Sequence, residues 1–335
     1  GCSADELILT RNTTESLDLA IGGQNWNAGD EAIMAEQDYG AMLDMFIQVK
    51  DRYGVVNKII SVPNHPKDDE EIVDIYRKAI TPKTKAIVPV HLFGRAANMD
   101  AIMEIATEHN LYVIEDNAQA IGADYTSKDG SKKKVGTIGH VGATSFFPSK
   151  NLGCYGDGGA IFTNDDNLAH ILRGIVNHGM YERYHHDVVG VNSRLDSIQA
   201  GVLKAKLPHL DTYNKARQDA ARKYSMALSV NSTIWAPTIC ETCDCHVFHQ
   251  YTLRIIGADR NGLMQHLLDK GIPCAIYYPI PLHSQKAYVD VRYKEEQFPV
   301  TNQLVKEVIS LPMHTELDDE QIQFITDSIL EFLNK

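Results

Sequence analysis

SFFPSKNLGCYGDGGA, at residues 145–160, is the stretch of this sequence that decides its fold. It places Lys150 in an otherwise apolar segment between two expected strands, GATSFF (142–147) and GAIFTN (159–164). Burying an ammonium group is costly, but burial also lowers the pKa of the amine and makes its neutral, nucleophilic form accessible. A surface lysine beside a turn would explain Lys150 alone, but not the whole segment.

The neighbouring segments alternate between strand and helix. KAIVPVHLF (85–93) and LYVIED (111–116) have the pattern of buried strands, whereas AANMDAIMEIATEHN (96–110) and DDNLAHILRGIVNHG (165–179) have that of helices. This βαβ rhythm predicts an α/β fold with a mainly parallel central sheet and helices on both faces. Ligand-binding residues of such sheets lie at the carboxyl ends of strands, where Asp116 falls.

The pattern changes in the second half of the chain. A long helical region at 196–228 is followed by short strands and by helices at 261–270 and 318–334. We therefore predict a large domain over residues 1–215 and a smaller C-terminal α+β domain over residues 216–335.

Charge and hydropathy exclude some classes of protein. The formal net charge is −12, whereas a nucleic-acid binder normally shows a basic surface. No apolar run approaches the ~18 residues of a membrane span. Residues 1–20 lack the basic start and apolar stretch of a secretion signal. We expect a cytoplasmic protein that binds neither nucleic acid nor membrane.

Three of the six cysteines form the cluster C-x-x-C-x-C-H at 240–246, namely Cys240, Cys243 and Cys245. The cluster has no second pair at the spacing of a zinc site. A reduced loop is the favoured interpretation, and no metal is predicted.

The polar residues near Lys150 suit one cofactor, pyridoxal 5′-phosphate (PLP). That cofactor needs an amine for its aldehyde, an anion for its pyridine nitrogen and donors for its phosphate. Lys150 is the candidate amine, Asp116 the candidate anion and Ser145 a candidate phosphate donor. The alternative for Asp116 is a helix N-cap after the strand.

Several further motifs, in the same order along the chain, give the sequence a family resemblance. They are PVHLFG (89–94), VIEDNAQAIGA (113–123), RYHHDVVGVNSRLDSIQA (183–200), HVFHQYTLRI (246–255), YYPIPLHSQKAY (277–288) and FPVTNQLVKEVISLPMHTEL (298–317). From about residue 81 onward the chain resembles the sugar-nucleotide aminotransferases of the DegT/StrS group. The resemblance implies a fold-type I PLP enzyme that aminates a nucleotide-linked keto sugar for polysaccharide or glycan precursor synthesis. The donor would be an amino acid such as glutamate. The spellings TSFFPSK and CYGDGGA are most similar to members that act on UDP-linked 3-keto amino-hexuronates.

The resemblance also implies roles for individual residues. Lys150 would bond the cofactor aldehyde, Asp116 would pair with the pyridinium nitrogen, and Gln119 would lie against the ring oxygen. Asn192, in NSRLD (192–196), would reach the PLP phosphate of the neighbouring subunit, which implies a homodimer with shared active sites.

Contacts with the substrate are less specific in the sequence. Arg194 is a candidate for an anionic substrate group, with a structural salt bridge as the alternative. Tyr277, Tyr278 and His283 could line a wide sugar-nucleotide cleft. A satisfied structural histidine is the default for His283, as for the three other histidines of the resembling motifs, His91, His246 and His249.

Residues 1–80 resemble instead the class V aminotransferase group. RNTTES (11–16) precedes an expected helix, so Thr13 and Thr14 could hold the phosphate at its N-terminus, or Asn12 or Thr13 could simply cap it. Tyr39 falls where an aromatic ring would cover PLP, with a core tyrosine as the alternative. The chain begins at Gly1, and an incomplete N-terminus or a mosaic joined near residues 81–85 would explain the mismatch.

Two other functions remain open from the sequence. The front part favours a class V-like lyase, desulfurase or epimerase, although the lysine segment is not of that type. A fold-retaining regulator or a catalytically impaired PLP-binding protein is the other alternative. The presence of Lys150, Asp116 and Gln119 favours the aminotransferase.

Overall fold

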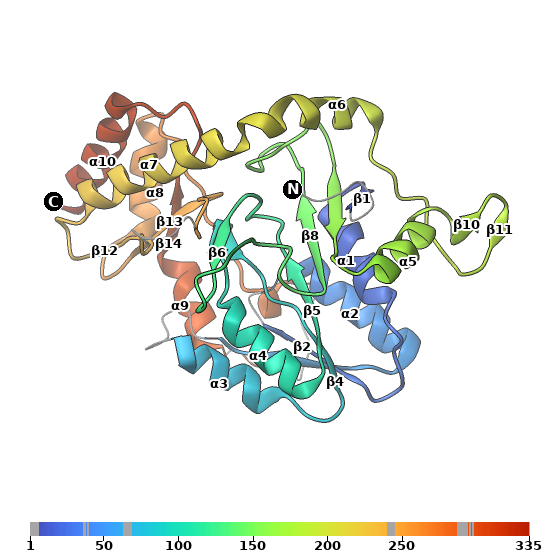
Figure 1. Ribbon diagram of the computed structural model, residues 1–335. Helices are drawn as coiled ribbons and strands as arrows, with labels where there is room; N and C mark the ends of the chain where they lie inside the picture. The colour runs from blue at the N-terminus through green and yellow to red at the C-terminus, as the bar shows by residue number, and fades with distance from the viewer. Residues whose placement is uncertain are drawn as a thin grey trace. The chain divides into compact units, whose positions relative to one another are not determined.

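A computed structural model describes residues 7–35, 38, 40–62, 69–239, 245–286, 294, 296 and 298–334 (Figure 1). Its contacts divide the chain into two compact units. Unit 1 comprises Gly1–Leu210 with Cys243–Cys245, and unit 2 comprises Asp211–Thr242 with His246–Lys335. Tyr39, Cys240 and Cys243 lie outside the described residues.

Unit 1 is built on a seven-stranded sheet of order β1-β9-β8-β5-β4-β2-β3. The strands are β1 (Leu7–Thr10), β2 (Glu31–Ala35), β3 (Val56–Ile60), β4 (Thr84–Ile87), β5 (Tyr112–Asp116), β8 (Val141–Ser145) and β9 (Gly159–Phe162). β9 is antiparallel to both of its neighbours, and the other pairs are parallel. Six of the seven strands therefore run in one direction, as an α/β fold requires.

The strand order explains which helices share a face of this sheet. The helices of unit 1 are α1 (Thr13–Gly22), α2 (Gly40–Tyr53), α3 (Asp69–Ala79), α4 (Met99–His109), α5 (Asp166–Val176) and α6 (Ser197–Lys206). The chain moves outward from β2 to β3 and then returns through β4 to β5. Because parallel crossovers are right-handed, α2 must cover one face and α3 and α4 the other. Accordingly α1 packs against α2 and α5, whereas α3 packs against α4 (Figure 1).

The carboxyl ends of the parallel strands meet at one edge of the sheet, called here the carboxyl edge. The register aligns three neighbouring strands, β1, β9 and β8, at this edge, because Gly159 pairs with both Thr10 and Ser145. On the next strand Asp116 is opposite Ala143 of β8. This edge is where ligands bind in α/β sheets.

The basic run at 132–134 differs from expectation. The sequence suggests a solvated hairpin tip, but Lys132–Lys134 is strand β7 and pairs with β6 (Asp124–Thr126). Residues 127–131 form the tip instead, where Gly130 adopts a φ of +82°. The three lysine side chains are exposed, as the expectation of a solvated segment requires.

A second hairpin in unit 1 joins β10 (Met180–Glu182) to β11 (His185–His186). Short 3-10 turns lie at η2 (Leu92–Gly94) and η3 (Leu207–His209). The turn η3 separates α6 from α7 at Pro208, where a helix interruption is expected, because proline lacks the N–H that an inner helical turn needs.

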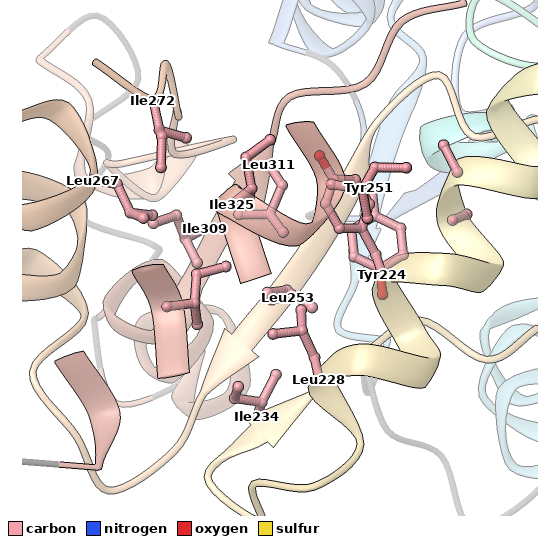
Figure 2. Close-up of a cluster of buried hydrophobic side chains, with 14 of the residues drawn as sticks. Tyr224, Leu228, Ile234, Tyr251, Leu253, Leu267, Ile272, Ile309, Leu311 and Ile325 are labelled. Carbon is pink, nitrogen blue, oxygen red and sulfur yellow. The ribbon is translucent and has the colours of Figure 1, made fainter. Parts of the chain in front are cut away.

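Unit 2 is a small α+β unit with its own core. A three-stranded antiparallel sheet, β12-β13-β14, is formed by Ile234–Trp235, Tyr251–Ile255 and Val308–Leu311. The helices are α7 (Leu210–Leu228), α8 (Arg260–Asp269), α9 (Pro299–Glu307) and α10 (Asp319–Leu333), with the turn η4 at Leu282–Ser284. Figure 2 shows Tyr224 and Tyr251 beside the aliphatic side chains of this core, including Leu253 and Ile309.

Two features of the described part of the chain bear on function. None of its helices is both long and apolar enough to cross a membrane. Nor does this part contain a group of three or more histidine, cysteine or acidic side chains able to hold a metal ion.

Candidate active site

Lys150 lies in a tight turn that directly follows β8. Its peptide N–H donates to the carbonyl of Phe147 at 2.8 Å, and Phe146 is bound through its N–H to Gly158 at 2.7 Å. The side chain is half-buried. Burial lowers the pKa of the Lys150 amine, and the nearby Asp116 carboxylate partly opposes that shift. The turn thus presents an amine that is easier to deprotonate than an exposed lysine.

Asp116 ends β5 at the carboxyl edge and is 4% exposed. Its Oδ1 accepts the N–H of Ala118 at 3.0 Å. Burial raises the pKa of this carboxyl, against the opposing effects of the Ala118 N–H and of Lys150. Its Oδ2 has no hydrogen-bond partner within the described part of the chain. A cationic N–H placed beside Oδ2 would supply the missing partner.

Gln119 is held by the turn η2, which follows β4, the strand beside β5 in the sheet. Its Oε1 accepts the peptide N–H of Phe93 at 2.5 Å. Phe93 has a φ of +57°, a left-handed conformation that turns this N–H toward Gln119. Asp116, the last residue of β5, and Gln119 lie only three residues apart in the chain.

The start of α1 forms another part of the carboxyl edge. Asn12 is the N-cap and accepts the N–H of Glu15 at 2.8 Å, which matches the capping alternative for Asn12. Thr13 is buried, and its hydroxyl has no hydrogen-bond partner among the described residues. Thr14 is half-buried beside it. An unpaired buried hydroxyl at a helix N-terminus suits an anion that contributes acceptor atoms.

Ser145 ends β8 at the same edge and is 6% exposed. Its Oγ accepts the N–H of Phe147 at 3.2 Å, which leaves the hydroxyl hydrogen available to a ligand. β9 connects this residue with the start of α1. At Gly159 a Cβ atom would lie only 2.4 Å from the carbonyl carbon of Asn12. The last glycine of GDGG therefore serves close approach, and none of the glycines at 156, 158 and 159 has a positive φ.

The NSRLD segment is attached to the same helix start. Ser193 is buried, donates its hydroxyl to Glu15 in the first turn of α1, and binds Val176 through its peptide N–H at 3.0 Å. Asn192 and Arg194 on either side are exposed, and Arg194 Nε donates to Asn192 Oδ1 at 2.9 Å. Arg194 forms no ion pair with any described residue, so the salt-bridge alternative finds no partner in the part of the chain that the structure describes.

The remaining predicted site residues belong to unit 2 or lie outside the described residues. Tyr278 and His283 belong to unit 2, where Tyr278 is 49% exposed. The ring of His283 stacks on Phe298 at 4.2 Å, and its Nε2 is buried without a partner among the described residues. Both stay predicted substrate contacts, and Tyr39 falls outside the described residues.

The carboxyl edge also holds an acidic residue that the sequence pattern did not indicate, Asp38. Asp38 is 7% exposed and accepts the N–H of Ala35 at 2.9 Å, just beyond β2. Burial raises the pKa of Asp38 to about 8, helped by the negative charge of Asp116. Its position next to Tyr39, the residue expected to cover PLP, is the signal in the sequence that could have indicated it.

PLP fits the residues of unit 1. Lys150 offers the amine, Asp116 an unpaired carboxylate oxygen, and Thr13 and Ser145 offer hydroxyl hydrogens near a helix N-terminus. These groups occupy the ends of neighbouring strands at one edge. The three parts of PLP that need a protein partner, its aldehyde, ring nitrogen and phosphate, therefore each find one.

Comparison with known proteins extends the resemblance over the whole chain. The model of the DegT/DnrJ/EryC1/StrS aminotransferase family matches residues 2–330. This match includes the front part, whose motifs resemble the class V group.

Three curated relatives are informative. A pleiotropic regulatory protein of Geobacillus stearothermophilus is 47% identical over 76% of this chain and 67% of its own length. A UDP-N-acetyl-3-dehydro-alpha-D-glucosamine 3-aminotransferase of Acidithiobacillus ferrooxidans is 41% identical over 96% of this chain and 82% of its own. A UDP-2-acetamido-2-deoxy-3-oxo-D-glucuronate aminotransferase of Pseudomonas aeruginosa is 40% identical over 95% and 84%, respectively.

Solved structures agree in fold. DesV of S. venezuelae has a TM-score of 0.87 and 35% identity, covering 98% of this chain and 85% of its own. A Bacillus subtilis protein, NtdA, crystallised with bound pyridoxamine phosphate, has a TM-score of 0.83 and 27% identity, covering 98% and 73%. The fold is thus that of PLP-dependent aminotransferases.

Proposed function

Since this chain belongs to the DegT/DnrJ/EryC1/StrS aminotransferase family, whose enzymes depend on PLP and act on sugar nucleotides, we propose a specific reaction for it. The donor is an amino acid, glutamate in the first place, and the acceptor is a UDP-linked 3-keto amino-hexuronate. The product would serve polysaccharide or glycan precursor synthesis in the cytoplasm. The single observation that carries the catalytic part is Lys150, a half-buried amine with a lowered pKa that interacts electrostatically with Asp116.

Each site residue has one task in this proposal. PLP supplies an electron sink that stabilises negative charge at the carbon from which a proton leaves. Lys150 would hold the cofactor through its aldehyde and would move that proton as a general base and acid. Asp116 would keep the ring nitrogen protonated, and Gln119 would bind the ring oxygen. Thr13, Thr14 and Ser145 hold the phosphate.

The arginines of unit 2 support a sugar acceptor over a small keto acid. A keto acid acceptor calls for an arginine free to grip its distal carboxylate. The described arginines of this unit instead all have protein partners: Arg217 binds three backbone carbonyls, Arg222 binds Asp219, Arg254 binds Glu307, and Arg260 binds the carbonyls of Val305 and Val308. Burial lowers the pKa of the Arg217 guanidinium to about 10, which is still high enough to keep the charge at neutral pH.

A shared active site in a homodimer completes the proposal. Asn192 is exposed beside a segment that Ser193 anchors to α1. From this position Asn192 would reach the PLP phosphate of a second copy. Arg194, exposed and without an acidic partner among the described residues, is the proposed contact for the hexuronate carboxylate.

The test compares acceptors in single-turnover reactions. The enzyme is first converted by glutamate to its amine form, and the return of the PLP absorbance is then followed with each acceptor. We expect the UDP-linked 3-keto hexuronate to react faster than dTDP-linked keto sugars, and both to react faster than oxaloacetate or pyruvate. Faster reaction with the keto acids would reject a sugar acceptor.

A second candidate function has one observation in its favour. The relative with 47% identity carries the name of a regulatory protein. A regulator that keeps PLP without turnover would bind the cofactor and show the resting absorbance, but would fail to react with glutamate or any other amino acid. The first half of the same experiment therefore separates the two functions.

A further inference from the structure

A buried pair, His91 and Glu115, lies next to the candidate active site in unit 1. Both side chains are 0% exposed, and His91 Nε2 lies 3.0 Å from Glu115 Oε2. Neighbouring residues of a strand point to opposite faces, so Glu115 points away from Asp116, the residue that follows it in β5. The side chain of Glu115 therefore lies on the face of β5 opposite to that of Asp116.

The hydrogen bonds of His91 define its protonation state. Its Nδ1 accepts the peptide N–H of Ala97 at 3.1 Å and so carries no hydrogen. Nε2 then carries the hydrogen of a neutral imidazole and donates it to Glu115. The carboxylate also accepts the N–H groups of Gly136, Ile138 and Gly139 at 2.6–2.7 Å. Burial alone would raise the pKa of Glu115, but these donors hold it below its usual value.

The pair fixes the turn that follows it. The peptide N–H of His91 donates to the backbone carbonyl of Asp116 at 3.1 Å. The carbonyl of His91 accepts the N–H of Gly94 at 3.2 Å. Between them lies Phe93, whose N–H binds Gln119. The side chain of His91, tied to Glu115 and Ala97, therefore fixes the first residue of the turn that holds Gln119.

The contact with Phe93 decides which way the Gln119 amide faces. A peptide N–H can only donate, so its partner must be the amide oxygen of Gln119. The Nε2 of Gln119 remains, and it has no partner among the residues that the structure describes. A ring oxygen that carries negative charge needs a donor of this kind.

We propose that His91 and Glu115 are positioning residues that keep the Gln119 amide turned with its Nε2 toward the PLP ring oxygen. They act through the turn at residues 91–94 and do not touch the cofactor. This inference rests on the proposed function, because it requires PLP beside Gln119.

The measurement is a pH titration of the absorbance of the PLP-bound enzyme. Its midpoint is the pH at which half of the bound cofactor has lost its proton. A donor to the ring oxygen stabilises its charged form and lowers the pH midpoint. In His91→Asn the shorter side chain keeps an acceptor for Ala97 but cannot reach Glu115. We expect the pH midpoint of this variant to rise by about one unit, the size of one lost hydrogen bond to a charged group. His91→Gln, whose amide can reach Glu115, should return most of this shift. We also expect kcat to fall more than KM changes.

Two comparisons separate positioning from general damage to the fold. His140→Asn is the matched control, since His140 also accepts a peptide N–H of β5, from Val113 at 3.0 Å, but contacts neither the turn nor Gln119. Its pH midpoint should equal that of the wild type. In a Gln119→Leu background, His91→Asn should cause no further shift, because the group through which it acts is gone. A shift that persists in that background would overturn the proposal.

Gln119→Glu tests the amide direction even if the His91 variants do not fold. This change keeps an oxygen for Phe93 and replaces Nε2 by a second oxygen, which repels the ring oxygen. The pH midpoint should rise above that of Gln119→Leu, and an unchanged midpoint would overturn the proposal. Wild-type enzyme without a PLP absorbance band would instead reject the proposed function itself.

Discussion

Lys150 and Asp116 interact electrostatically across two neighbouring strand ends, and burial disfavours the charged form of both. The carboxylate raises the pKa of the amine that burial lowers, and the ammonium lowers the pKa of the carboxyl that burial raises. A bound cofactor whose ring nitrogen pairs with Asp116 would give the carboxylate a different cation. Lys150 would then be free to react as a neutral amine.

Removal of the carboxylate should therefore make Lys150 more acidic. In Asp116→Asn the group that raises the amine pKa is lost, so the neutral amine becomes available at lower pH. The rate at which the cofactor-free protein captures PLP should reach its half-maximum at lower pH than in the wild type. kcat should fall about a hundredfold or more, because charge developing on the ring loses its stabilising partner. A capture profile shifted to higher pH would contradict the electrostatic relationship.

Lys150→Ala should abolish the covalent bond to PLP. After borohydride treatment, mass spectrometry should find PLP on Lys150 of the wild type and no adduct on the variant. Lys58→Ala is the control, because Lys58 is also half-buried in unit 1 but is paired with Glu31 at 3.1 Å. An adduct on another lysine of the Lys150 variant would refute the assignment.

Thr13→Val should stabilise the fold of the cofactor-free protein and weaken its binding of PLP. The Thr13 hydroxyl is buried without a hydrogen-bond partner among the described residues, a condition that costs about 1–3 kcal/mol. Denaturant unfolding should show a larger free energy of unfolding for the variant, with an increased Kd for PLP. Thr163→Val is the control. The Thr163 hydroxyl donates to the backbone carbonyl of His140 at 2.8 Å, so loss of this hydroxyl should destabilise the protein. An unchanged PLP affinity in Thr13→Val would remove this hydroxyl from the phosphate site.

Asp38 should make stability depend on pH in a defined window. Its folded pKa of about 8 exceeds the unfolded value of about 3.9. The wild type should therefore lose stability as pH rises from about 4 to about 8, because the unfolded chain releases the proton first. Asp38→Asn keeps an acceptor for Ala35 and removes this loss, so its Tm relative to the wild type should increase over that window. Asp129→Asn, at an exposed carboxyl with a lowered pKa, should show no such increase.

Shared active sites should be visible by complementation. Lys150→Ala and Asn192→Asp subunits are each expected to have little activity alone. Mixed dimers contain one site with both wild-type groups, so an equal mixture should regain about a quarter of wild-type activity under random pairing. A fully active monomer in sedimentation, or a mixture no better than its parts, would exclude the shared site.

The sequence by itself determined the fold class, and it predicted Lys150 as the reactive lysine with Asp116, Gln119 and Ser145 as its partners at the site. Strand and helix periodicities are local, and an apolar segment with one lysine is visible without coordinates. For the same reason it located α4, α5, α8 and α10 to within a few residues. The long strand expected at 85–93 was less accurate: β4 ends at Ile87, and the chain then turns with a positive φ at Phe93.

Only the tertiary structure decided which side chains meet and which way they face. The register that joins Thr10, Gly159 and Ser145 brings residues far apart in the chain to one edge. The pKa of Asp38 is about 8 because the carboxyl is buried and because it interacts with the negative charge of Asp116. The direction of the Gln119 amide depends on the N–H of Phe93, 26 residues earlier. Such features depend on long-range packing and low-dielectric burial, which local sequence patterns do not encode.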